Sequence, residues 1–270
     1  MSRFFILAGY FELAIYLQLT GKLDQYISRH YRYLVYLSMV LSLFFLLNQL
    51  YIWMKESQQT RTVDKKSNQL SFILLSFPLL VGFFLPQVSL DSSIVEAKGY
   101  HFPTALPTGK TSDPTDDTNQ QYLKPDSSSY FTPTSYQQEM TQALKKYDGQ
   151  ETITINQDNY MEVLELIYLF PQQFVNRQIS LTGFVYNKPK SSKELYLFRF
   201  GIIHCIADSG VYGLLTKGYQ KNFPDNSWLR VTGTLHLGYQ KDLNQRLPFL
   251  QVSQVALIDP PDNPYVYRAF

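Results

Sequence analysis

Hydrophobic residues are concentrated in the first ninety positions of the chain, where they form three nearly continuous runs. The second run, residues 33–54, is 22 residues long and contains no charged side chain. An apolar run of this length can cross the hydrocarbon layer of a bilayer as a helix. Tyrosines and Trp53 mark its two ends, as is typical of residues at the membrane interface. The pattern therefore predicts a membrane-spanning helix over residues 33–54.

The runs on either side of it predict two further spans, over residues 4–20 and 69–86. The first holds a single charge, Glu12, and the third contains Pro78 and Gly82, which spanning helices tolerate. A cleaved signal peptide is the alternative for the first run. Glu12 and the lack of a small-residue cleavage site argue against it. A buried core helix is the alternative for the third run.

The distribution of positive charges predicts the orientation of these spans. A cytoplasmic N-terminus places five Lys and Arg residues, and the α-amino group, on the cytoplasmic side, against four outside. Positive charge is enriched in cytoplasmic loops. We therefore expect a multi-pass protein of the cell membrane whose N-terminus is cytoplasmic and whose chain after about Leu90 is extracytoplasmic.

Polar residues replace the apolar runs after the third span. Residues 91–150 are predicted as a flexible linker, because their centre, residues 107–137, is rich in Pro, Ser, Thr, Asp and Gln and shows no sustained apolar period. The spans and the linker together leave residues 151–270 for a folded domain.

Alternating apolar positions return in residues 151–270 and predict a small β-domain. A helix is predicted over residues 159–170, with Asp158 as its N-cap and Pro171 after its end. Residues 195–207 are apolar on both faces, which predicts a central strand with a bend at Gly201. Further strands are predicted at residues 151–155, 179–185, 229–237 and 250–258. Five strands of this kind resemble an OB-like barrel preceded by a short helix, in a membrane protein of the α+β class. A sandwich or another small barrel is the alternative.

Composition narrows the possible functions. A net charge of +2 without a dense Lys/Arg block gives no reason to expect nucleic acid as a partner. The single cysteine, Cys205, excludes an internal disulfide and a CxxC redox pair. Nucleotide-binding glycine patterns, HExxH and GxSxG are all absent from the sequence. We therefore do not expect nucleotide-driven catalysis.

The most suggestive polar segment is residues 204–210, which holds His204, Cys205 and Asp208. These are possible metal ligands, with zinc as the candidate ion, or the parts of a Cys-His-Asp hydrolase. In a regular strand His204 and Asp208 would share one face and Cys205 would lie on the other, so a joint site requires the strand to end or bulge here. The leading alternative is a buried free cysteine followed by a turn.

Glu12 is a second candidate of a different kind. An ionisable group inside a span is costly and normally faces other helices or a water-filled path. It is therefore a candidate contact with a partner or a transport path. A hydrated position near the membrane interface is the alternative, because the helix is short.

The order of these elements resembles the YcgQ-like family of bacterial membrane proteins. The resemblance covers nearly the whole chain apart from the linker. It rests on residues 21–27 between the first two spans, 86–93 after the third span, and the segments SLTGFVY (180–186) and 199–208. In the family pattern two adjacent cysteines often occupy the position that reads His204-Cys205 here. This difference puts paired-thiol chemistry in doubt but leaves metal binding open.

What the resemblance implies is an accessory, non-catalytic subunit that works with a separate multi-span permease in the lipid bilayer. The spans predicted from the residues agree with this accessory role, because three short spans are a poor candidate for a complete transport path. Two other hypotheses stay open: a membrane-anchored metal-binding or redox-sensing protein that uses His204, Cys205 and Asp208, and a membrane-tethered hydrolase.

Overall fold

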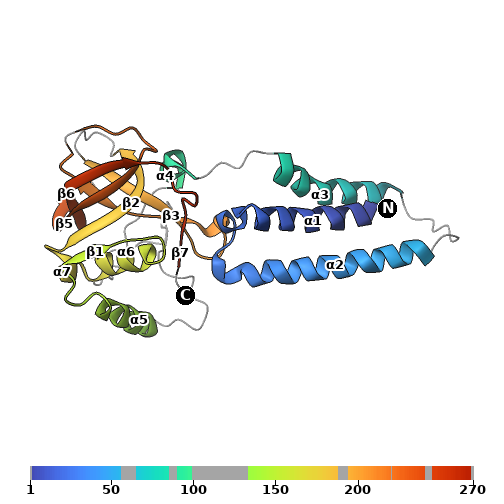
Figure 1. The fold of residues 1–270 in the computed structure, drawn as a ribbon, viewed down its shortest axis with the longest axis horizontal. Coiled ribbons are helices and arrows are strands. Elements are labelled where there is room, and N and C mark those ends of the chain that lie inside the picture. Colours follow the sequence, from blue (N-terminus) through green and yellow to red (C-terminus); the bar gives the residue numbers. More distant parts are fainter. Residues whose placement is uncertain are drawn as a thin grey trace, which may run out of the picture. The chain divides into compact units, whose positions relative to one another are not determined.

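The chain divides into two compact units, Met1–Val88 and Ser89–Phe270. The computed structural model describes residues 2–55, 65–84, 90–98, 133–187, 194–219, 221–240 and 245–268 (Figure 1). The first unit is helical. The second unit contains the strands and several short helices.

Three helices make up most of the first unit. They are α1 (Ser2–Leu19), α2 (Arg32–Lys55) and α3 (Lys65–Phe84), with two short 3₁₀ turns, η1 (Lys22–Gln25) and η2 (Arg29–Tyr31), between α1 and α2. Helix α1 packs against both α2 and α3 and runs between them (Figure 1). It is therefore the central helix of this unit.

Small residues bring α1 and α3 close together. A Cβ added to Gly9 would lie 2.8 Å from Leu79, and one added to Gly82 would lie 3.0 Å from Leu13. Glycine at these two positions therefore lets the helices approach, as small residues do in membrane helix pairs. Tyr10 adds a hydrogen bond from its hydroxyl to the carbonyl oxygen of Leu75, at 3.0 Å.

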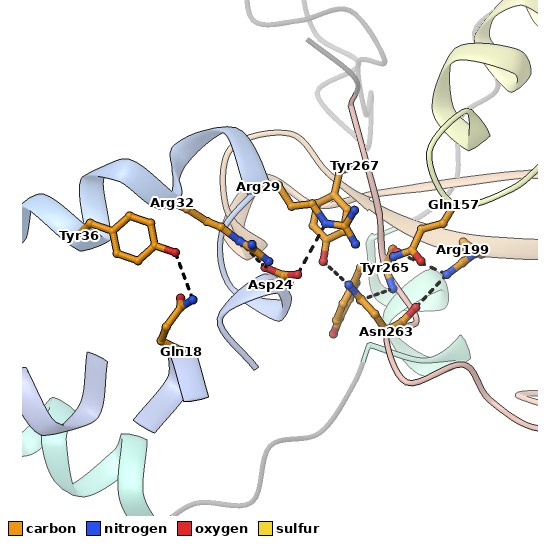
Figure 2. A network of polar contacts seen from close by, with 10 residues as sticks. All are labelled: Gln18, Asp24, Arg29, Arg32, Tyr36, Gln157, Arg199, Asn263, Tyr265 and Tyr267. Atoms are coloured by element: carbon orange, nitrogen blue, oxygen red, sulfur yellow. Dashed lines mark hydrogen bonds and ion pairs between the residues drawn. The ribbon is translucent and has the colours of Figure 1, made fainter. Parts of the chain in front are cut away.

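Polar contacts join α1 to α2 near the turn that connects them (Figure 2). Nε2 of Gln18 donates to the hydroxyl of Tyr36 at 3.1 Å. In the connection itself, Nε of Arg32 donates to Oδ1 of Asp24 at 2.9 Å, and Nε of Arg29 lies 3.6 Å from Oδ2 of Asp24. The turn is thus fixed by one carboxylate between two guanidinium groups.

Among the described helices, only the one at Arg29–Lys55, which contains α2, is long and apolar enough to cross a membrane by length and composition. The apolar parts of α1 and α3, Phe4–Leu19 and Leu70–Phe84, are shorter. At about 1.5 Å per residue these parts are shorter than a hydrocarbon layer of about 30 Å. Three membrane spans accordingly stay a prediction.

The second unit contains a closed five-stranded barrel, as predicted, but residues 210–217 form a ring strand that was not predicted, and the strand predicted at residues 151–155 lies outside the ring. Its strands are β2 (Gln178–Asn187), β3 (Glu194–Ile202), β4 (Gly210–Lys217), β5 (Trp228–Gln240) and β6 (Gln245–Ile258). Strand β2 pairs with β3 and β5, β3 with β4, and β5 with β6, all antiparallel, and the parallel pair of β4 with β6 closes the ring. Strands β1 (Thr152–Thr154) and β7 (Val266–Tyr267) add parallel pairs to β2 and β3.

The predicted helix before the barrel is present as α6 (Tyr160–Leu169), and Pro171 begins the next short helix, α7 (Pro171–Phe174). The predicted cap is wrong by one residue, because the N-cap is Asn159. Its side-chain oxygen accepts from the backbone N–H of Asn156 at 2.8 Å, outside the helix. No helix occurs in the described residues between β4 and β5.

Two helices lie in the segment that the sequence predicted as linker: α4 (Ser92–Lys98) and α5 (Pro133–Lys145). Val95 of α4 is fully buried in the core of the second unit, and the backbone N–H of Ser92 donates to Oδ1 of Asn226 at 2.8 Å. Met140 and Ala143 of α5 are buried in the same unit. Both ends of the segment therefore pack on the barrel domain, and residues 107–132 of the predicted tether lie outside the described residues.

Strand β3 is buried on both faces, as its apolar sequence predicted. Leu195 and Leu197 point into the core cluster that also contains α6, whereas Phe198 and Phe200 belong to an aromatic cluster on the other face. The strand ends at Ile202, so the predicted extension to residue 207 is wrong. Gly201 serves close packing, since a Cβ there would lie 2.5 Å from the ring of Tyr212 and 2.8 Å from Sδ of Met161.

Burial of tyrosine hydroxyls in this core predicts a loss of stability at alkaline pH. Burial raises the pKa of Tyr160, Tyr168 and Tyr212 above the ordinary value of 10.0 and raises the pKa of Tyr219 to about 12. The unfolded chain therefore releases these protons at a lower pH than the folded one. Stability is fully present below pH 10 and falls above it, by about 1.4 kcal/mol per pH unit for each such tyrosine.

Urea unfolding of the full-length protein in detergent, followed between pH 8 and pH 11.5, measures this fall. The part of the phenolate absorbance that belongs to the buried tyrosines should rise together with unfolding and not before it. Ionisation of all tyrosines in the folded protein near pH 10 would contradict the buried arrangement.

Candidate functional site

The segment His204–Asp208 forms a tight turn, because β3 has already ended and η3 (Ile206–Asp208) follows. The carboxylate of Asp208 organises the turn. It accepts from the backbone N–H of His204 at 2.9 Å and from that of Cys205 at 3.0 Å. Nδ1 of His204 lies 2.6 Å from Oδ2 of Asp208. The structure thus brings His204 and Asp208 together, through the strand end that a joint site required.

These hydrogen bonds explain the turn by themselves, without a bound metal or other ligand. Both oxygens of Asp208 already accept hydrogen bonds from the turn, and Cys205 is a half-buried free thiol. Within the described part of the chain, no group of three or more His, Cys, Asp and Glu residues is placed to hold a metal ion. The arrangement therefore supports the interpretation as a capped turn rather than the zinc or redox hypothesis.

His236, the other histidine of the predicted domain, lies apart from any such group in the described residues. It is half-buried on β5, and its ring packs against Phe249 with centroids 5.8 Å apart.

Sequence analysis missed a heavily connected polar side chain among the described residues of the second unit, Arg199 on β3. It is 4% exposed. Its guanidinium donates to the carbonyl oxygen of Pro264 at 3.1 Å. It also donates to the carbonyl oxygens of Asn263 and Tyr265, at 2.9 and 3.3 Å (Figure 2). These residues belong to the C-terminal strap, which we define as Asn263–Arg268. Arg199 therefore fastens the strap to the barrel.

Aromatic rings surround the same guanidinium. Its central carbon lies 5.5 Å from the ring centroids of both Tyr160 on α6 and Trp228 on β5. Cation–π contacts of this kind are strongest where water is excluded. Burial lowers the pKa of Arg199, and the neighbouring Tyr160 and Tyr267 oppose that shift. Arg199 thus joins β3, β5, α6 and the strap.

A buried ion pair makes a second connection to the strap. The guanidinium of Arg268 lies 3.2 Å from the carboxylate of Glu165 on α6, and both side chains are 5% exposed. Gln157 adds a hydrogen bond from Nε2 to the carbonyl oxygen of Tyr265 at 3.3 Å (Figure 2). The sequence did contain one signal for this network: an arginine within a strand that is apolar on both faces. A buried charge requires partners, so this arginine could have predicted a polar network.

Glu12, the remaining candidate, lies on α1 in the first unit. Its side chain is exposed and makes no hydrogen bond or ion pair with any residue that the structure describes. Glu12 and the turn at His204 belong to different units of the chain. They are therefore separate candidate sites.

Replacing Arg199 tests the network around the strap. We expect Arg199→Ala to lower the free energy of unfolding by about 2–4 kcal/mol, because three carbonyl oxygens lose a donor and two rings lose their cation. Fluorescence of Trp228 in a Trp53→Phe background reports the unfolding of this unit. Arg230→Ala, on the exposed side of β5, is the matched control and should change stability by less than about 0.5 kcal/mol. Equal effects of the two substitutions would refute the role given to Arg199.

Replacing Asp208 tests the turn. Asp208→Ala should destabilise the second unit by about 1–2 kcal/mol, because two backbone N–H groups lose their acceptor. Cys205→Ser should be nearly neutral, since the thiol is free and half-buried. Thermal unfolding of both variants in detergent compares them. A larger effect of Cys205→Ser than of Asp208→Ala would instead point to a specific role of the thiol.

Comparison with known proteins places the whole chain in one family. The DUF1980 N-terminal domain matches residues 2–101, and the DUF1980 C-terminal domain matches residues 130–268. A protein of Streptococcus mutans, named "Putative two-component membrane permease complex subunit", is 53% identical over 271 residues, covering 100% of both chains. The UPF0703 protein YcgQ of Bacillus subtilis is 34% identical over 291 residues, again covering 100% of both chains. With both domains matched in order, the chain belongs to the DUF1980 family, the YcgQ-like family that its sequence resembles.

Proposed function

We propose that this protein is an accessory, non-catalytic subunit of a membrane permease complex, anchored by three spans and carrying an extracytoplasmic barrel domain. The observation that carries the proposal is the large apolar surface that the helices of the first unit leave exposed. The full-length relative in Streptococcus mutans bears the name of a permease complex subunit, which supports the same assignment.

The exposed apolar side chains of α2 and α3 are too numerous for a helical unit in water. Those on α2 include Tyr33, Leu37, Val40, Leu43, Phe44, Leu47, Tyr51 and Trp53, and those on α3 include Leu70, Ile73, Leu74, Phe77, Leu80 and Phe84. A soluble protein rarely leaves so much contiguous apolar surface uncovered. Lipid is the environment in which helices of this composition are stable, because their backbone hydrogen bonds are satisfied internally.

The packing of α1 supports three spans even though its apolar part is short. Helix α1 contacts both α2 and α3 along its length, so a bilayer that holds α2 also holds its neighbours. A short span is accommodated by local thinning of the bilayer or by flanking residues that reach the interface. Three spans from a cytoplasmic N-terminus put the barrel domain outside the cytoplasm.

An accessory role follows from the small size of the helical unit. Transport paths are enclosed by repeated sets of helices or by discontinuous helices that meet at the centre of the membrane. Here the core of the unit is one helix, α1, between two others. Such a unit is suited to hold the barrel domain beside a larger membrane protein that supplies the path.

Affinity purification tests this proposal. The full-length chain, tagged at its C-terminus and extracted from its native membrane in mild detergent, should co-purify with a multi-span membrane protein in a fixed ratio. Trp53→Ala, at the end of α2, is the control for a nonspecific weakening of membrane anchoring. This variant should still co-purify with the partner. Recovery of the chain alone, or only as copies of itself, would contradict the proposal.

A further inference from the structure

The surface of α1 has three sides, and two of them are already occupied. One side packs on α2 and the second on α3. The exposed residues along the third side are Phe5, Glu12, Tyr16 and Leu19; Tyr16, at the edge of this side, also packs its ring against Phe83 of α3, with centroids 6.3 Å apart. Their spacing of seven, four and three residues places them in one line on a helix, because side chains three, four and seven apart share a face. We call this line the α1 stripe.

Glu12 is the only charged residue on the α1 stripe and lies well inside the helix. It is seven residues before the C-terminal end of α1 and ten after its beginning, or about 10 Å and 15 Å at the rise of an α-helix. In a membrane-embedded α1 this carboxylate faces the hydrocarbon layer. Ionisable side chains at that depth normally face the interior of a bundle and pair with another group.

Several other polar side chains of the helical unit find partners within it. The hydroxyl of Tyr10 donates to the carbonyl oxygen of Leu75, and Oγ of Ser38 donates to the carbonyl oxygen of Val35. Glu12, by contrast, is exposed and has no polar partner among the described residues. No described residue of this chain supplies its partner, so another molecule is the candidate source.

The sequence of the spans excludes a second copy of this chain as the source of a cation. Residues 4–20, 33–54 and 69–86 contain no Lys and no Arg, and Glu12 is their only charge. Two copies that met along the α1 stripe would bring two carboxylates together, which is unfavourable in a medium of low dielectric constant. The complementary charge has to lie on a different protein.

We propose that the α1 stripe is the face on which a helix of a second, different membrane protein packs, and that this helix places a Lys or Arg side chain beside Glu12. The proposal rests on the proposed function, since it requires a membrane partner. Phe5, Tyr16 and Leu19 supply the apolar contacts, with exposed fractions of 64%, 39% and 81%. Glu12 fixes the register of the two helices through one charge pair.

Site-specific photocross-linking of the full-length chain in its native membrane tests the proposal. A benzoylphenylalanine replaces Phe5 on the α1 stripe or, as the matched control, Phe44 on the exposed face of α2. The probe at position 5 should capture a second membrane protein through a peptide from a spanning helix that contains Lys or Arg. Glu12→Gln should lower the yield of this product about tenfold, as expected for losing one partner of a desolvated charge pair, and Glu12→Asp should lower it less. The yield from position 44 should not change.

Three results would overturn the proposal: capture only of a second copy, capture of a helix without Lys or Arg, or an unchanged yield in Glu12→Gln. The identity of the captured helix is informative even if Glu12→Gln does not reach the membrane. If the cross-link fails but the permease still co-purifies, the α1 stripe is not the docking face, and the accessory role is unaffected. Failure of both experiments rejects both proposals.

Discussion

Every large apolar side chain in this protein needs an environment without water, and the two units meet that requirement differently. The barrel domain covers its own apolar residues, so that Tyr239, Val255 and Leu257 are the only large apolar side chains exposed among its described residues. The helical unit covers one central helix and leaves most of α2 and α3 uncovered. Because apolar transfer from water is the main driving force of folding, the helical unit requires lipid or a partner, whereas the barrel domain does not.

Within the barrel domain, strand β3 is apolar on both faces, so other elements must cover each face. Helix α6 packs against one face, and Val95 of α4, Trp228 and Tyr265 pack with the aromatic residues of the other. The C-terminal strap pairs with β3 through β7, and Arg199 holds its carbonyl oxygens from inside the barrel. A buried arginine is tolerated here because carbonyl oxygens and aromatic rings replace its water. The charge therefore specifies where the strap docks, in addition to any stability that it contributes.

The sequence predicted those features whose signal is local and periodic. The uncharged run of α2, the alternation of the barrel strands and the helix that ends before Pro171 are all of this kind. Helices α4 and α5 were missed because one is seven residues long and the other carries few apolar residues, so that their burial depends on distant strands. The Arg199 network was missed for the same reason, since its acceptors lie more than sixty residues away along the chain. The turn at Asp208 could not be predicted from the sequence, because strand alternation alone does not show where β3 ends.

The membrane topology is the most direct test of the central claim that α1, α2 and α3 all cross the bilayer. In a Cys205→Ser background, single cysteines at Lys22, Lys55 and Lys221 mark the α1–α2 connection, the end of α2 and the barrel domain. An impermeant maleimide applied to intact cells should label positions 22 and 221, and position 55 only after permeabilisation. If the cysteine at position 221 is instead labelled only after permeabilisation, like the one at position 55, then the barrel domain is cytoplasmic. In that case α3 does not cross the membrane, and the account is wrong.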